Sequence, residues 1–124
     1  MKGILIVDHG SRLTEANEML REMADLIQSM AGPDVVVRYA HMELADPDIA
    51  QGFGDCVRAG ATDVTVFPYM LSPGRHSTAD IPRMVAAAAK AFPGVMFSVT
   101  PAFGLHEKLA QVVLERAAVE VHAD

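Results

Sequence analysis

The sequence predicts an α/β fold in which a four-stranded parallel sheet carries helices on both faces. Two observations predict it. Apolar, β-branched runs alternate strictly with segments whose apolar residues recur every three or four positions, and four such strand–helix units follow one another. Such an alternation is typical of parallel strands joined by right-handed crossover helices. No linker, low-complexity tract or internal repeat interrupts it, so we expect one domain over residues 1–124.

The first unit begins with a strand at 3–7, where "GILIV" is apolar throughout, as in a strand covered on both faces. Apolar residues then recur at helical spacing over 13–30, which predicts an amphipathic helix. "GPD" at 32–34 ends that helix. The β-branched run "VVVRYAHM" predicts the second strand at 35–42.

The second helix has a start signal in "ADPDIA". Asp46 can cap the helix, Pro47 suits its first position, and Asp48 favours its positive end. We expect this helix to run to about Gly60, which can adopt the left-handed conformation that ends helices. "TDVTVF" predicts the third strand at 62–67.

The remaining elements are two helices and a strand. Ser77 and Asp80 have the spacing of a capping box, so the third helix is expected over 77–92. "FPG" ends it, and "VMFSVT" predicts the fourth strand at 95–100. The last helix is expected over 106–121.

Composition narrows the function classes. The chain has 124 residues, 51% of them hydrophobic, and a formal net charge of -6. This acidic balance argues against a nucleic-acid or anionic-membrane partner, since either requires a basic face. No apolar run approaches the ~20 residues that span a bilayer. Cys56 is the one cysteine, expected to be a buried core residue, and its lack of an internal partner fits a reducing compartment, so we expect a cytoplasmic protein.

Polar residues gather where the predicted strands end. In open parallel sheets, ligands bind beyond the carboxyl ends of the strands. Imidazoles together with a carboxylate suit a divalent ion of the first transition row. The alternative is that His9 and His76 are ordinary loop histidines that serve as caps and turn donors. The residues at this edge are His9, Gly10, Ser11, Arg12, Glu43, Gly74, Arg75, His76, Gly104 and His106.

Three further histidines have other expected roles. His41 lies just inside the second strand and is expected to pack and bond locally. His106 could either cap the last helix or support a metal ligand, and His122 is expected in solvent. The glycine-rich turns match neither GxGxxG nor GxxxxGK[ST], which argues against a phosphate cradle of those types. The Arg-His-Gly motif of histidine phosphatases is also absent, because Asp8 stands in place of its arginine.

Four segments together carry a family resemblance. "HGSR", "MELADP", "SPGRHSTADIP" and "PAFGLHEKL" follow the four strands in this order, so the match covers nearly the whole chain. The chain resembles the small, single-domain sirohydrochlorin chelatases, the short class II tetrapyrrole chelatases. The resemblance implies insertion of a divalent metal into sirohydrochlorin without ATP, by a homodimer, with no cofactor beyond the metal substrate. On the family's pattern His9 and His76 handle the metal, and Glu43 is the nearby carboxylate.

The chemistry of metallation agrees with these residue types. Two pyrrole protons must leave, and a partly dehydrated metal must reach the ring face. Neutral imidazoles, with a reference pKa near ~6.5, can act as ligands and as bases. Glu43 can balance the metal's charge or accept a proton.

Substrate binding is expected from the same edge. Sirohydrochlorin is a polycarboxylate, which would explain Arg12 and Arg75 beside the two histidines. Ser11 and Gly74 complete the expected substrate-binding residues.

Three points stay open at this stage. Asp8 departs from the family's pattern, which commonly has a small residue there, and it could attract metal or cap the turn. Cobalt is the first expectation for the metal, on family habit, with iron and nickel as alternatives. The alternative to an enzyme is a non-catalytic metal or tetrapyrrole carrier that uses the same site.

Overall fold

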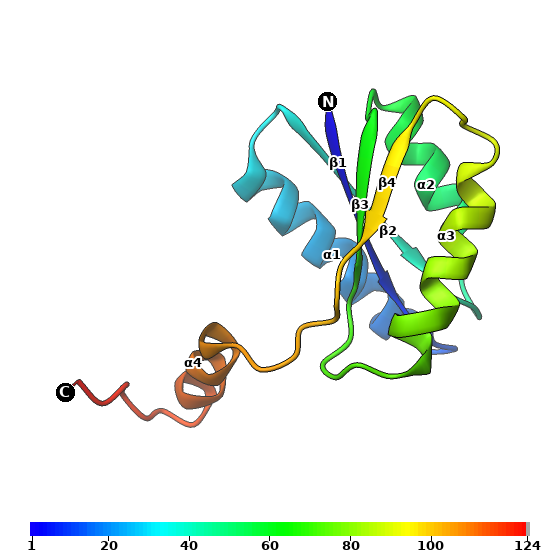
Figure 1. Ribbon diagram of the computed structural model, residues 1–124. Helices are drawn as coiled ribbons and strands as arrows, with labels where there is room; N and C mark the ends of the chain where they lie inside the picture. Colours follow the sequence, from blue (N-terminus) through cyan, green and yellow to red (C-terminus); the bar gives the residue numbers. More distant parts are fainter. Residues whose placement is uncertain (124) are drawn as a thin grey trace.

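The computed structural model describes residues 1–123 and contains a parallel sheet in the order β2-β1-β3-β4 (Figure 1). The fold-class prediction is confirmed, because strands and helices alternate along the chain and every strand pair is parallel. The strands are β1 (Lys2–Asp8), β2 (Val35–His41), β3 (Asp63–Pro68) and β4 (Met96–Val99). The helices are α1 (Thr14–Ala31), α2 (Ile49–Arg58), α3 (Ile81–Ala89) and α4 (Glu107–Arg116), with a π-helical turn, η1 (His76–Asp80), directly before α3.

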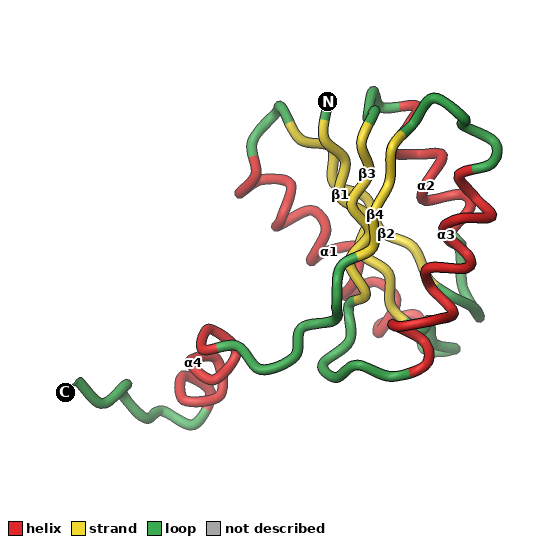
Figure 2. Tube along the Cα trace, viewed as in Figure 1, coloured by secondary structure: helices red, strands yellow, loops and turns green. Residues whose placement is uncertain are grey.

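The sheet separates two hydrophobic cores. Helix α1 covers one face, and α2 and α3 cover the other (Figure 2). Along β1, Leu5 and Val7 point toward α2 and α3, whereas Ile6 points toward α1. This alternation is that of a strand buried on both faces, which is why β1 is apolar throughout. The core beneath α2 and α3 is the larger, and Phe53 is fully buried in it.

Helix α2 packs closely on the sheet and has a different cap from the expected one. A Cβ on Gly52 would lie 2.8 Å from the Cβ of Ala40, so only glycine allows this approach. The N-cap is Asp48, not Asp46. Its side chain accepts the Gln51 backbone N–H at 2.8 Å, and the Gln51 side chain accepts the Asp48 N–H at 2.8 Å. The reciprocal box with Gln51 satisfies two donors, which a cap at Asp46 could not do.

The capping box predicted for the third helix is wrong. The chain is already helical from His76 onward, so Asp80 has helical dihedrals and no capping hydrogen bond. Ser77 bonds instead to Gly74, and Asp80 bonds to His76. The two residues have the spacing of a cap but lie inside a continuous helical segment, where their side chains have other partners.

Helix α4 differs most from expectation. It ends at Arg116 rather than near residue 121, none of its residues is buried, and it lies apart from the sheet (Figure 1). The segment before it is tied to the loop after β3, because the N–H groups of Phe103 and Gly104 donate to the carbonyls of Met70 and Leu71 at 3.0 and 2.9 Å. Helices α1, α2 and α3 therefore form the two covering layers. Among residues 1–123, no helix has the length and apolar character needed to cross a membrane.

We expect Phe53→Ala to lower the free energy of unfolding by about 3 to 5 kcal/mol, because it empties the centre of the larger core. Urea unfolding would measure the loss. Phe97→Ala is the matched control, since Phe97 touches the Phe53 ring but is 41% exposed, and its loss should be clearly smaller. Equal losses would show that Phe53 does not anchor this core.

Candidate functional site

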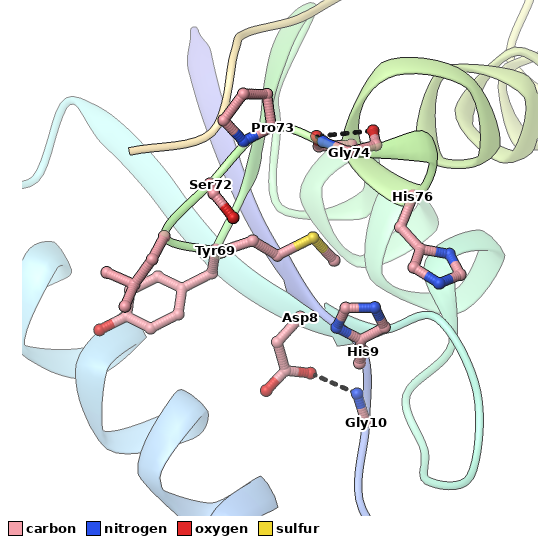
Figure 3. Close-up of a pocket in the computed structure, with 11 residues that line it drawn as sticks. Asp8, His9, Gly10, Tyr69, Ser72, Pro73, Gly74 and His76 are labelled. Atoms are coloured by element: carbon pink, nitrogen blue, oxygen red, sulfur yellow. Dashed lines mark hydrogen bonds between the residues drawn. The ribbon is translucent and has the colours of Figure 1, made fainter. Parts of the chain in front are cut away.

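A cavity of about 490 Å³ opens at the carboxyl edge of the sheet (Figure 3). It lies between the end of β1, the loop after β3 and the start of η1. His9 and His76 both line it, and their ring centroids lie 4.4 Å apart with the ring planes at 86°. The structure therefore brings together the two histidines that the sequence singled out, although 67 positions separate them along the chain (76 − 9).

His76 is oriented by an aspartate one helical turn further on. Its Nδ1 lies 3.0 Å from Oδ2 of Asp80. A carboxylate only accepts hydrogen bonds, so Nδ1 is the donor, and in the neutral ring Nε2 then keeps the lone pair. A carboxylate behind the ring in this way fixes the tautomer and the orientation of the ring, an arrangement common behind metal-binding histidines.

His9 is positioned by its backbone. The carbonyls of Asp8 and His9 accept the N–H groups of Met42 and Glu43 at 2.9 and 3.1 Å, so the loop after β1 stays paired with the loop after β2. Gly10 makes this possible. Its φ is +88°, and a Cβ there would lie 1.8 Å from the Glu43 carbonyl oxygen.

Several residues of the predicted site do not line the cavity. The Glu43 side chain is exposed, and only its backbone meets His9. Ser11 organises the loop, since its N–H donates to Asn17 at 2.9 Å and its hydroxyl accepts the Leu13 N–H at 3.0 Å. Arg12 and Arg75 are exposed at the rim. Gly74 is the one member of the expected substrate-binding group that lines the cavity.

Sequence reasoning missed part of the site. Tyr69 and Leu71 line the cavity from the loop after β3, and no sequence signal marked them. Ser72 also lines it and is the first residue of the segment "SPGRHSTADIP". Asp80 did carry a signal, because positions four apart in a helix are neighbours and it follows His76 by four. Asp8 also lines the cavity, beside His9.

The other histidines and the cysteine take structural places. His41 is 1% exposed and bonds to Asp8, so the prediction that it packs and bonds locally is confirmed. His106 caps α4, because its Nδ1 accepts the Lys108 N–H at 3.1 Å, which decides between the two roles left open for it. Cys56 is buried as predicted, and burial raises its pKa to about 12, which leaves an inert thiol.

The parallel sheet and the cavity at its carboxyl edge define an α/β protein whose cavity lies where such folds usually bind their ligands. Residues 3–120 match the family model CbiX. The chain belongs to the CbiX family.

Three similar proteins are named as sirohydrochlorin chelatases. A protein of Arabidopsis thaliana named sirohydrochlorin ferrochelatase, chloroplastic, is 46% identical over 114 residues, which are 92% of this chain and 50% of that protein. A sirohydrochlorin cobaltochelatase of Methanococcoides burtonii is 32% identical over 93% of both chains. The structure of the sirohydrochlorin chelatase SirB from Bacillus subtilis subspecies spizizenii in complex with cobalt matches with a TM-score of 0.85 at 31% identity. That match covers 94% of this chain and 50% of SirB, so this chain spans half the length of two of these three proteins.

We expect Gly10→Ala to destabilise the protein by more than about 2 kcal/mol, because it forces a left-handed residue and a backbone clash. Thermal unfolding would show a lowered Tm. Gly94→Ala is the control, since nothing lies within 4 Å of a Cβ at that position and its φ is not positive. A Gly10→Ala protein as stable as the Gly94→Ala protein would mean that the two loops can separate freely.

Proposed function

We propose that the protein inserts a divalent metal ion into sirohydrochlorin without ATP. The observation that carries this proposal is the pair of imidazoles, His9 and His76, in one open cavity at the carboxyl edge of the sheet. Membership of the CbiX family and the names of the relatives support the same substrate. The metal is a substrate here, and we propose no cofactor beyond it.

In this proposal His9 and His76 bind the metal, and neighbouring groups orient them or accept protons. The Asp80 contact leaves Nε2 of His76 able to donate to a metal, and His9 lies beside it. Two nitrogen ligands replace part of the hydration shell of the ion while leaving positions open for pyrrole nitrogens. Insertion breaks two pyrrole N–H bonds and releases their protons as the four ring nitrogens bind the metal. We propose the imidazoles and the exposed carboxylate of Glu43, whose backbone pairs with His9, as the acceptors of those protons.

In this proposal the exposed residues Arg12 and Arg75 bind the substrate. Arg12 follows β1 and Arg75 precedes η1, so two guanidinium groups flank the loops that carry the histidines. Guanidinium groups bind carboxylates in bidentate geometry, which suits a ring with several carboxylate arms. Ser11 supports the loop of Arg12, and Gly74 leaves the cavity wall without a side chain.

Cobalt is the metal we propose first. The relative whose length matches this chain is named a cobaltochelatase, and the similar SirB structure holds cobalt. Iron is the main alternative, because the Arabidopsis relative is named a ferrochelatase, and nickel is the third. Cobalt insertion would serve cobalamin synthesis, and iron insertion would serve sirohaem synthesis.

The test is the absorption change of sirohydrochlorin when Co²⁺ is added with and without the purified protein, with Fe²⁺ and Ni²⁺ run in parallel. We expect His9→Ala and His76→Ala each to remove most of the rate enhancement while leaving the Tm nearly unchanged. Both side chains lie at an exposed rim, so neither substitution opens a core cavity.

The outcomes separate the two classes of function. A carrier would bind metal stoichiometrically yet leave the rate at that of the protein-free control, which would overturn the enzyme proposal. Full activity in either histidine variant would remove that histidine from metal handling.

We also propose that residues 1–124 act as one domain of a homodimer. The cavity is open, whereas ligand sites normally bury most of their ligand. A second apolar cleft of about 400 Å³ lies between α1, β3 and α4, and Met23, Phe67 and Val112 are among its walls. This chain covers 50% of SirB, and a second copy would equal the remainder of SirB in length. A two-fold dimer would cover such a cleft and set two rims face to face.

Light scattering across a dilution series, run alongside activity, tests the dimer. We expect Val112→Glu to shift the equilibrium toward monomer and to reduce activity in parallel, because it places a charge in the apolar cleft. Val119→Glu is the control, since Val119 is similarly exposed but lies beyond α4. A fully active monomer would contradict both the dimer and a shared substrate cleft.

Location is part of the proposal. The buried thiol of Cys56 is free, which fits a reducing compartment, and we propose the cytoplasm. The Arabidopsis relative, in contrast, is named chloroplastic.

A further inference from the structure

We propose that Asp8 supplies the negative charge that draws the divalent ion into the cavity, and that the buried His41 is the positioning residue that holds its carboxylate there. This inference rests on the proposed function, because it assumes that His9 and His76 receive the ion. It assigns a role to the one aspartate that departs from the family's pattern and to a buried histidine that metallation otherwise leaves unused.

The strand register brings the two residues together. Asp8 and His41 are paired at the carboxyl ends of the neighbouring strands β1 and β2. Both follow the alternation that points Ile6 and Tyr39 toward α1, so their side chains lie on the same face of the sheet. Nδ1 of His41 lies 2.6 Å from Oδ1 of Asp8, and the histidine is 1% exposed. Since a carboxylate only accepts, His41 is the donor.

A second donor fixes the same oxygen. The Gly10 N–H donates to Oδ1 of Asp8 at 3.0 Å, a bond that Figure 3 shows beneath His9. Two donors on one oxygen leave the carboxyl group little freedom to rotate. Within residues 1–123, neither the backbone nor any side chain donates a hydrogen bond to Oδ2. The Asp8 side chain is 24% exposed and lines the cavity, so it remains within reach of a ligand.

The negative charge of Asp8 has no counterpart among the other residues within 1–123 that line the cavity. Among the described residues that line the cavity, Asp8 is the only carboxylic acid. Its charge also reaches the opposite wall. Partial burial raises the pKa of Tyr69, and the negative charge of Asp8 raises it further. The same charge attracts a cation entering the cavity, and beside a partly buried carboxylate this attraction is stronger than it is in bulk water.

A role as a simple turn cap explains less of the geometry. Asn or Ser at position 8 would accept the Gly10 N–H equally well. Such a cap needs no buried imidazole behind it, and burying a polar ring is costly unless its hydrogen bond is made. The His41 contact instead selects an acceptor at position 8 and holds it against the cavity.

The test is Co²⁺ binding, measured by isothermal titration calorimetry in the absence of sirohydrochlorin. Asp8→Asn keeps an oxygen for both donors but removes the charge, so the Tm should change little. We expect its Kd for Co²⁺ to rise at least about tenfold. Glu15→Gln is the matched control, because it removes one exposed negative charge just after the same loop and outside the cavity, and its Kd should match that of the wild type.

Two variants test the positioning role. The side-chain amide of His41→Asn can still donate to Asp8, whereas His41→Leu has no donor. We expect the asparagine variant to bind Co²⁺ more tightly than the leucine variant. Equal Co²⁺ affinities in the two variants would overturn the role of His41. If the leucine variant does not fold, the role is overturned when His41→Asn binds Co²⁺ as weakly as Asp8→Asn does.

The remaining outcomes are distinct. If the wild type binds Co²⁺, His9→Ala loses that binding and Asp8→Asn binds as the wild type does, then only the inference about Asp8 fails. A Glu15→Gln loss as large as that of Asp8→Asn would likewise overturn it, because the effect would then reflect overall charge. If the wild type does not bind Co²⁺, or His9→Ala binds it unchanged, the proposed function fails as well.

Discussion

The site depends on one constraint, the backbone pairing of the loop after β1 with the loop after β2 at the carboxyl edge of the sheet. Pairing between β1 and β2 does not stop at the last strand residue but continues for two further hydrogen bonds, to the N–H groups of Met42 and Glu43. This close approach leaves no room for a side chain at Gly10. The position of His9 is therefore set by sheet pairing and not by the packing of its own ring. The central strand β1 thereby fixes the backbone of His9 at this edge of the sheet.

The fold could be predicted further than the site. Strands β1, β2 and β3 were predictable because burial on both faces demands runs of apolar residues, and local composition records that demand. The early end of α4 was not predictable, because the apolar positions of 117–121 have the same spacing whether or not a surface is present to bury them. Packing against the rest of the molecule decides that, and α4 has no buried residue.

The sequence predicted the two histidines of the site but not all the residues that form the walls of the cavity. His9 and His76 follow strands whose ends must meet at one edge, so topology alone brings them near each other. Tyr69 and Leu71 line the cavity through the path of the loop after β3, which depends on hydrogen bonds to residues far along the chain, such as Phe103. The tie between Asp8 and His41 depends on strand register, which a single sequence does not specify.

Helix α4 has ten residues, fewer than a helix needs to persist alone in water. None of its residues is buried, and it faces α1 and β3 across the apolar cleft, so its stability depends on what fills that cleft. In the proposed homodimer, local folding and association would become one equilibrium, in which α4 becomes ordered as the second copy binds. Raising the protein concentration would then increase the fraction of molecules in which α4 is formed.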